Sequence, residues 1–152
     1  MPARRALYAV LDLATGKVIG SLHQRHRAID TPHSVADVAY VDRLTAAATG
    51  YVRCAATHRP LFQVLFGVGL DKSHHPEIDV AARPVADAFL TPARAIRPDK
   101  TEAYELTLAV IATAHGHASL LLDGAFGQGP DAVDAATRRA ATVTCAIIAG
   151  WA

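Results

Sequence analysis

The chain is poor in cysteine and carries little net charge, and each shortage argues against a class of protein. Its 152 residues include two cysteines, Cys54 and Cys145, whose spacing does not fit a metal site. The sequence also shows no export signal. Such cysteines are typical of reduced, buried side chains in a cytoplasmic protein. The net charge of +1 does not indicate nucleic-acid binding, because proteins that bind nucleic acid usually have a markedly basic face. The local basic cluster is "HQRHR", residues 23–27.

Long hydrophobic runs are also missing. After Arg4 and Arg5 the apolar run "ALYAVL" ends at Asp12, which is too short for the core of a signal peptide. The longest stretch without a charged residue spans 106–122 and contains two histidines, so it falls short of a membrane span. We therefore expect a soluble, cytoplasmic protein without a membrane partner.

What the sequence does contain is apolar residues, which make up 51% of a chain of single-domain length. This content is enough to build one buried core. Residues 6–12 and 17–22 are short β-favouring runs around "LATG", a pattern that predicts a β-hairpin. Pro32 ends that pattern. We expect two parts, a hairpin in residues 1–30 and a helical domain in residues 31–152.

Helical periodicity governs the second part. Residues 35–57 carry apolar side chains three and four positions apart, and Pro60 suits the start of a short helix. Residues 77–96 and 101–123 predict two longer helices, and we expect Asp131 to cap the last one. The predicted fold class is all-α with a short N-terminal hairpin.

The segment "TAHGHASLLLDG" raises the question of a metal site, because His115 and His117 flank one glycine. In a strand the two imidazoles would share a face, but in a helix they lie on nearly opposite sides. The flanking sequence is long and rich in alanine, which favours a helix. Since a helical zinc pair needs a spacing of three or four residues, we expect two separately packed histidines and no metal.

The last two predicted helices have more apolar surface than one chain needs. The helix at 101–123 is apolar nearly all round, and the final helix has a seam of small and apolar residues at alternating spacings of three and four. This pattern favours a homodimer in which the two helices of each chain form a four-helix bundle. Alternatively, the apolar surfaces of both helices could pack within one chain. The expected interface residues are His117, Leu121, Val133, Ala136, Ala140, Val143, Ile147, Gly150 and Trp151.

Two segments carry a resemblance to a known family. "AATGYVRCAATHRPLFQVLFGVGL" has the order Tyr-Val-x-x-Ala, His-x-Pro and "LFxxLF", and "AVIATAHGHASLLLDGAF" contains His115 and Gly116 as a His-Gly pair. From residue 34 onward the chain resembles the C-terminal regulatory domain of TetR-type transcriptional repressors, in the subfamily with a Trp-His-Gly signature. The tryptophan has no counterpart, since Ile111 or Ala112 occupies that turn. The resemblance implies a helical domain that dimerises through its last two helices and binds a small, mostly apolar effector.

The effector site that this resemblance implies needs apolar walls and a few polar groups. Tyr104 would supply a hydroxyl and His115 a switchable donor or acceptor. Each of these residues has an alternative role as ordinary core, and no cofactor is expected. The candidate lining residues are Phe62, Leu65, Phe66, Phe89, Tyr104, Leu108, Ile111 and His115.

The N-terminal part departs from that family. No segment of the form "TxxxIAxxAGVSxGTxYxHF" precedes residue 34, so we expect no helix-turn-helix and no direct DNA binding. Residues 6–30 instead resemble a hairpin segment of insertion-sequence transposases of the DDE, Tc1/mariner-like type. We therefore expect a truncated regulator that keeps its dimerisation and effector-binding domain. The alternatives are a non-functional fusion remnant and a dominant-negative dimer partner of an intact regulator.

An enzyme is not expected. Ser119 and His115 are four residues apart, but no acid partner or oxyanion donor is placed near them in the sequence. The histidine- and acid-rich segment "DKSHHPEID", residues 71–79, is more typical of a solvated loop than of a metal site.

Overall fold

The computed structural model describes residues 35–66 and 76–151, and the predicted hairpin at 6–22 lies outside these residues. The described chain is helical, as the sequence predicts, and contains no strand. Its five helices are α2 (Val35–Thr57), α3 (Arg59–Phe66), α4 (Pro76–Ile96), α5 (Lys100–Leu122) and α6 (Pro130–Gly150). The predicted bounds of α2 agree with those observed.

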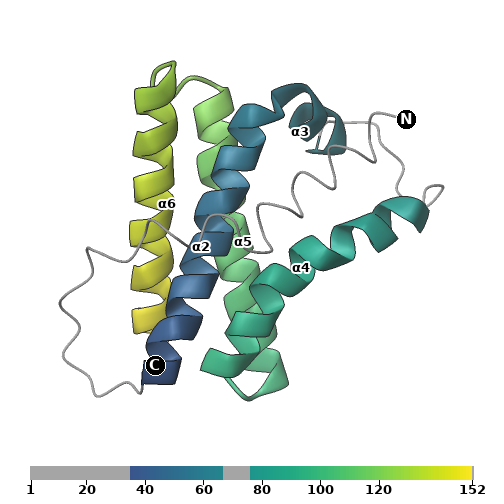
Figure 1. Ribbon diagram of the computed structural model, residues 1–152, viewed down its shortest axis with the longest axis vertical. Helices are drawn as coiled ribbons and strands as arrows, with labels where there is room; N and C mark the ends of the chain where they lie inside the picture. Colours follow the sequence, from purple (N-terminus) through teal and green to yellow (C-terminus); the bar gives the residue numbers. More distant parts are fainter. Residues whose placement is uncertain (1–34, 67–75, 152) are drawn as a thin grey trace.

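Helix α2 is the centre of the arrangement, because it contacts α3, α4, α5 and α6. Helices α2, α5 and α6 pack against one another along their lengths, whereas α4 crosses at an angle and packs on α2 and α5 (Figure 1). The short helix α3 turns away from the end of α2. This arrangement leaves α3 and the first half of α4 on the same side of the bundle.

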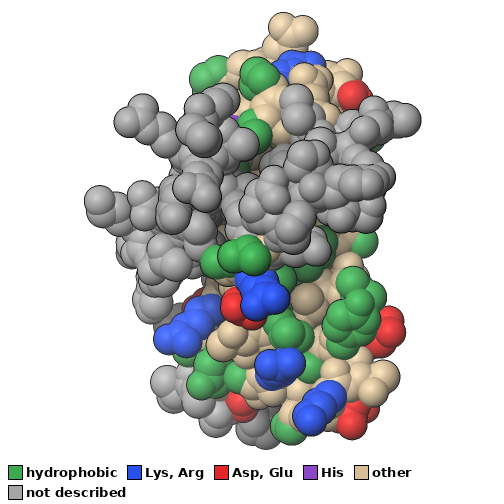
Figure 2. Space-filling view, turned by 90° about the vertical axis from the view of Figure 1, so that its right-hand side faces the viewer, with side chains coloured by type: hydrophobic (Ala, Val, Ile, Leu, Met, Phe, Trp, Pro, Cys, Tyr) green, Lys and Arg blue, Asp and Glu red, His purple; other side chains and the backbone are tan. Residues whose placement is uncertain are grey.

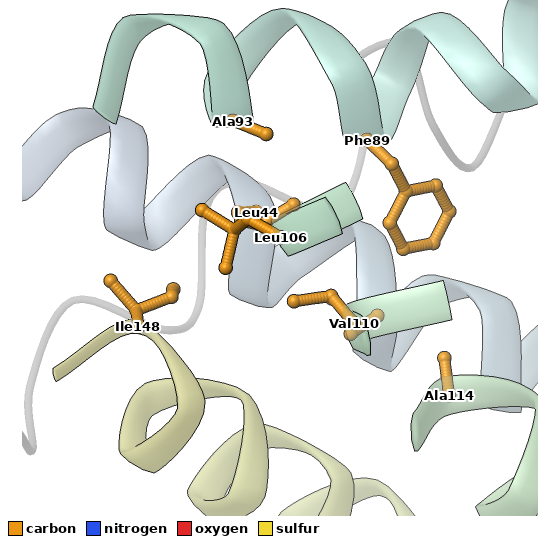
Figure 3. Packing of buried hydrophobic residues seen from close by; sticks show 8 residues of the cluster. Leu44, Phe89, Ala93, Leu106, Val110, Ala114 and Ile148 are labelled. Carbon is orange, nitrogen blue, oxygen red and sulfur yellow. The ribbon is translucent and has the colours of Figure 1, made fainter. Parts of the chain in front are cut away.

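The main core lies where α2, α4, α5 and α6 meet. Leu44, Leu106 and Val110 are completely buried there, and Phe89 from α4 closes one side (Figure 3). Removing a side chain of this size from water stabilises a fold by about 1.5–3 kcal/mol. A second cluster joins Val52 of α2 to small residues of α6. The central helix therefore contributes to both clusters.

The starts of α5 and α6 are built differently. Asp99 caps α5, because its carboxylate accepts hydrogen bonds from the backbone N–H groups of Thr101 and Glu102. The prediction that Asp131 caps α6 is wrong. Gly129 is the cap residue, with a φ of 83° and no side-chain bond, and Pro130 opens the helix. Asp131 lies in the first turn instead.

Helix α5 is long and apolar enough to meet the length and composition test for a membrane span. Its residues Leu106, Val110, Ala114 and Ala118 are nevertheless fully buried against neighbouring helices. A core helix of a folded domain passes the same test, and these contacts favour that interpretation. On the face shown in Figure 2, acidic and basic side chains lie intermixed over the lower described surface.

Candidate functional site

The polar centre of the candidate site is a pair of residues on two different helices. The hydroxyl oxygen of Tyr51 on α2 lies 3.0 Å from Nδ1 of His115 on α5. The two residues are 64 positions apart in the chain, so only the packing of α2 on α5 brings them together.

Aromatic rings from α3 and α4 surround this pair. Phe62 stacks on His115 at 5.3 Å between ring centroids, and Phe66 meets the same imidazole edge-on at 4.6 Å. Tyr51 makes edge contacts with Phe62 at 5.8 Å and with Phe89 at 6.3 Å. Each such contact adds roughly 0.5–1.5 kcal/mol beyond the burial of the rings. Four helices thus contribute to one aromatic cluster, which comprises Tyr51, Phe62, Phe66, Phe89 and His115.

The cluster is apolar enough to change the ionisation of its neighbours. Burial raises the pKa of the Tyr51 hydroxyl well above its ordinary value, with a smaller contribution from Cys54. Burial also raises the pKa of the Cys54 thiol to about 11. Both groups are therefore neutral at physiological pH, and the Tyr51 hydroxyl keeps its proton for a hydrogen bond.

Helix α3 is fixed to the rest of the domain at its first residue. The Arg59 guanidinium donates a hydrogen bond to the backbone carbonyl of Leu122, near the end of α5. A cation suits a helix C-terminus, where the carbonyl groups are unsatisfied and the helix dipole is negative. This contact anchors the helix that carries Phe62 and Phe66.

The structure brings together four of the eight residues predicted to line an effector site: Phe62, Phe66, Phe89 and His115. Ile111 packs against the adjacent core. The side chain of Leu65 lies outside the described set. The remaining two residues of the predicted set are exposed.

Tyr104 and Leu108 do not belong to the cluster. They are 55% and 42% exposed, respectively, and they lie nearer the start of α5 than His115 does. The sequence pattern placed them on one stripe with His115, but the rings of Phe62 and Phe66 pack on His115. The hydroxyl at the site comes from Tyr51 instead.

Tyr51 was missed in the sequence. Its signal was its spacing in α2, where Leu44, Ala48, Tyr51 and Ala55 recur four, three and four positions apart. That spacing places the tyrosine on the buried face of the helix. A buried tyrosine usually needs a hydrogen-bond partner, and the partner is a residue distant in sequence.

The residues predicted for a dimer interface divide into three groups. Leu121, Ala136 and Ala140 are buried in the second core cluster with Val52. The seam of α6 therefore packs on the protomer's own helices in this structure. Four others are partly buried against the same chain, and two are exposed. The partly buried residues are His117, Val133, Ile147 and Trp151, and the exposed ones are Val143 and Gly150.

His117 has its own surroundings, separate from those of His115. Its Nδ1 donates to the carbonyl of Thr113 at 2.8 Å, and its ring stacks on Phe126 at 6.1 Å. The Arg139 guanidinium lies 5.0 Å from the centre of the same phenylalanine ring. The two histidines thus have different partners, as the helical spacing predicts. Within 35–66 and 76–151, no group of three potential ligands could hold a metal ion.

Comparisons with known proteins agree with this architecture. Residues 44–144 match the family model described as "Tetracyclin repressor-like, C-terminal domain". No curated protein matches the chain, and no solved structure does. The matched range begins in the middle of α2 and ends within α6, so it includes Tyr51, His115 and all three phenylalanines of the aromatic cluster.

Proposed function

The chain belongs to the family of tetracyclin repressor-like C-terminal domains, and from this premise we propose that it is the regulatory domain of a TetR-type transcriptional regulator. In this role it binds a small, mostly apolar effector and forms a homodimer. We propose that the domain binds a ligand and does not catalyse a reaction. We also propose that it is located in the cytoplasm. The observation that carries the proposal is the Tyr51–His115 pair within a shell of phenylalanine rings.

The aromatic cluster suits a ligand site for three reasons. Its walls are apolar, and its polar groups are few and lie close together, which is the usual composition of small-molecule sites. Its members come from α2, α3, α4 and α5, so a ligand there would change the relation of four helices. Phe66 is 49% exposed, which leaves one edge of the cluster open to solvent.

The dimer surface proposed here is formed by exposed apolar residues of α5. Between Glu105 and Asp123 this helix has no charged residue, and Leu108 and Leu120 are 42% and 49% exposed. A Cβ added at Gly116 would meet nothing within 4 Å, so another helix could approach closely there. The exposed Val143 of α6 would extend this surface.

Regulation of DNA requires a helix-turn-helix segment, and residues 35–66 and 76–151 form the regulatory domain alone. The second candidate role follows from the dimer surface. Through this surface the domain would pair with an intact relative and block its binding to DNA. Subfamily membership by the Trp-His-Gly signature and a transposase-derived N-terminus are further parts of the proposal.

The first test is native mass spectrometry of the full chain after gentle purification. We expect the mass of a dimer, with an additional small molecule retained by each protomer. Leu108→Glu combined with Leu120→Glu should reduce the dimer fraction, while Val80→Glu on α4, where the native side chain is 63% exposed, should leave it unchanged. A bare monomer at all concentrations would contradict the dimer.

A separate variant tests whether the aromatic cluster binds the effector. His115→Ala should lose the retained small molecule without losing the dimer, because the His115 ring packs against Phe62 and Phe66, whereas Leu108 and Leu120 are exposed. Retention of the molecule by His115→Ala would place the effector elsewhere.

A further inference from the structure

We propose that α3 is a lid over the Tyr51–His115 pair, which opens at its junction with α2 while the rest of the domain stays folded. Arg59 fastens the lid when it is closed. The inference rests on the proposed function in one respect, because it makes the opening of α3 the route by which an effector reaches the aromatic cluster.

A single stripe of side chains attaches α3 to α5. Arg59, Phe62 and Phe66 recur three and four positions apart, so they lie on one face of the helix. Arg59 donates a hydrogen bond to the Leu122 carbonyl, and both rings pack on His115, with centroids 5.3 and 4.6 Å from that of the imidazole. The backbone of α3 approaches that of α2 at few points, in contrast to the extensive approach of α2 to α5. Release of three side chains therefore frees α3 from α5.

The junction between α2 and α3 is a single turn residue, His58. Backbone hydrogen bonds flank it, from the His58 N–H to the Cys54 carbonyl at 2.9 Å and from the Phe62 N–H to the His58 carbonyl at 3.0 Å. Pro60 has no N–H group to donate to the Ala56 carbonyl, so the helical hydrogen bonds are interrupted there. Such a break allows α3 to change direction without disturbing the body of α2.

Little buried surface holds α3 in place. Of its side chains that the structure describes, none is fully buried: Phe62 is partly buried and Phe66 is 49% exposed. By contrast, Leu44 of α2 and Leu106 of α5 are completely buried in the main core. Elements with few buried apolar contacts open at a lower free energy than the whole domain unfolds. We therefore expect α3 to open while the other helices stay packed.

Opening of α3 would uncover both polar groups of the pair. Phe62 lies against the His115 imidazole with an angle of 26° between the two planes, and it also contacts the Tyr51 ring at 5.8 Å. Removal of this one side chain thus uncovers a ring on α2 and a ring on α5. An effector would enter along the path that Phe62 and Phe66 vacate.

The test measures how fast His115 reacts with diethyl pyrocarbonate, which modifies accessible imidazoles, in the full chain without added ligand. Arg59→Met removes the cation and keeps most of the aliphatic stem. It should raise the rate at His115 roughly two- to tenfold, the range for one hydrogen bond. His117 is the internal control, because its ring contacts Phe126, and its rate should not change. Fragmentation mass spectrometry assigns the modification to each histidine.

A matched variant controls for the loss of a positive charge. Arg53 lies on α2, half exposed, and pairs with Asp134 on α6. Arg53→Met should therefore leave the rates at both histidines unchanged. A rate at His115 that does not respond to Arg59→Met, or an equal increase at His115 and His117, would overturn the inference.

Urea distinguishes the opening of a lid from unfolding of the domain, and this series uses the unaltered chain, so it remains decisive if Arg59→Met fails to fold. The rate at His115 should depend only weakly on urea, because opening α3 exposes little surface. A rate that rises with urea as steeply as the unfolding constant would contradict the lid. None of these measurements uses an effector. Their failure is therefore distinct from the absence of a retained small molecule in native mass spectrometry, which tests the proposed function.

Discussion

Tyr51 and His115 are joined by a 3.0 Å hydrogen bond between the middle of α2 and the middle of α5. Both side chains lie inside the domain, where phenylalanine rings from α3 and α4 exclude much of the solvent. A polar contact in such surroundings helps to position two helices as well as two side chains.

The first prediction concerns this bond. Tyr51→Phe removes the hydroxyl and keeps the ring contacts, so we expect the free energy of unfolding to fall by about 1 kcal/mol. Urea denaturation followed by circular dichroism measures the change. Tyr104→Phe is the matched control, since Tyr104 is 55% exposed, and it should have almost no effect. Equal effects of the two substitutions on the free energy of unfolding would show that the Tyr51–His115 hydrogen bond does not stabilise the fold.

The second prediction compares two leucines of α5 that are two residues apart. Leu106 is fully buried in the main core, whereas Leu108 is 42% exposed. Leu106→Ala should lower the free energy of unfolding by about 2–5 kcal/mol, since it removes buried methyl groups and leaves a cavity. Leu108→Ala should cost far less at protein concentrations where the chain is monomeric. Thermal unfolding of both variants checks the order, and a larger loss for Leu108→Ala would mean that α5 is rotated from the orientation described.

The third prediction tests the two helix starts. Asp99 accepts two backbone hydrogen bonds at the start of α5, so Asp99→Ala should lower the free energy of unfolding by about 0.5–2 kcal/mol. Asp131 makes no capping bond in α6, so Asp131→Ala should cost only the weaker interaction with the helix dipole. Chemical denaturation of the two variants side by side gives the comparison. A similar loss of free energy of unfolding at both positions would indicate that Asp131 caps α6 after all.

The fourth prediction is a loss of stability in alkaline solution. The pKa of Cys54 rises from its ordinary 9.0 to about 11 on folding, because burial disfavours the thiolate. Between these values the unfolded chain releases a proton that the folded chain retains. The contribution of Cys54 is therefore constant below pH 9.0 and declines as the pH rises toward 11.

Tyr51, whose pKa burial also raises, extends this decline to higher pH. Urea unfolding across the alkaline range should give a falling free energy of unfolding, with a shallower slope for Cys54→Ala. The slope is the relevant quantity, since the substitution also changes packing. An unchanged slope in the variant would show that Cys54 does not titrate in this range.

The sequence by itself determined where most helices lie. The periodic apolar residues of 35–57 gave the bounds of α2, and those of 101–123 placed α5 within one residue of its observed ends. These features depend on neighbours three and four positions apart, which the local sequence contains. The separation of His115 from His117 follows from the same geometry. The family was also predictable from the sequence, from ordered motifs in α2, α3 and α5.

Only the tertiary structure decided what each apolar stripe packs against. The seam of Ala136 and Ala140 has the spacing of a helix pair, but its partner is the protomer's own core, and periodicity cannot distinguish the two cases. Tyr104 and His115 share a stripe of α5, yet Tyr104 is exposed, whereas the rings of Phe62 and Phe66 pack on His115. The Tyr51–His115 contact joins residues whose neighbours in sequence carry no information about each other. The Tyr51–His115 contact forms because α2 and α5 pack with these two residues at the same level along the helix axes. All of the core contacts together determine this alignment.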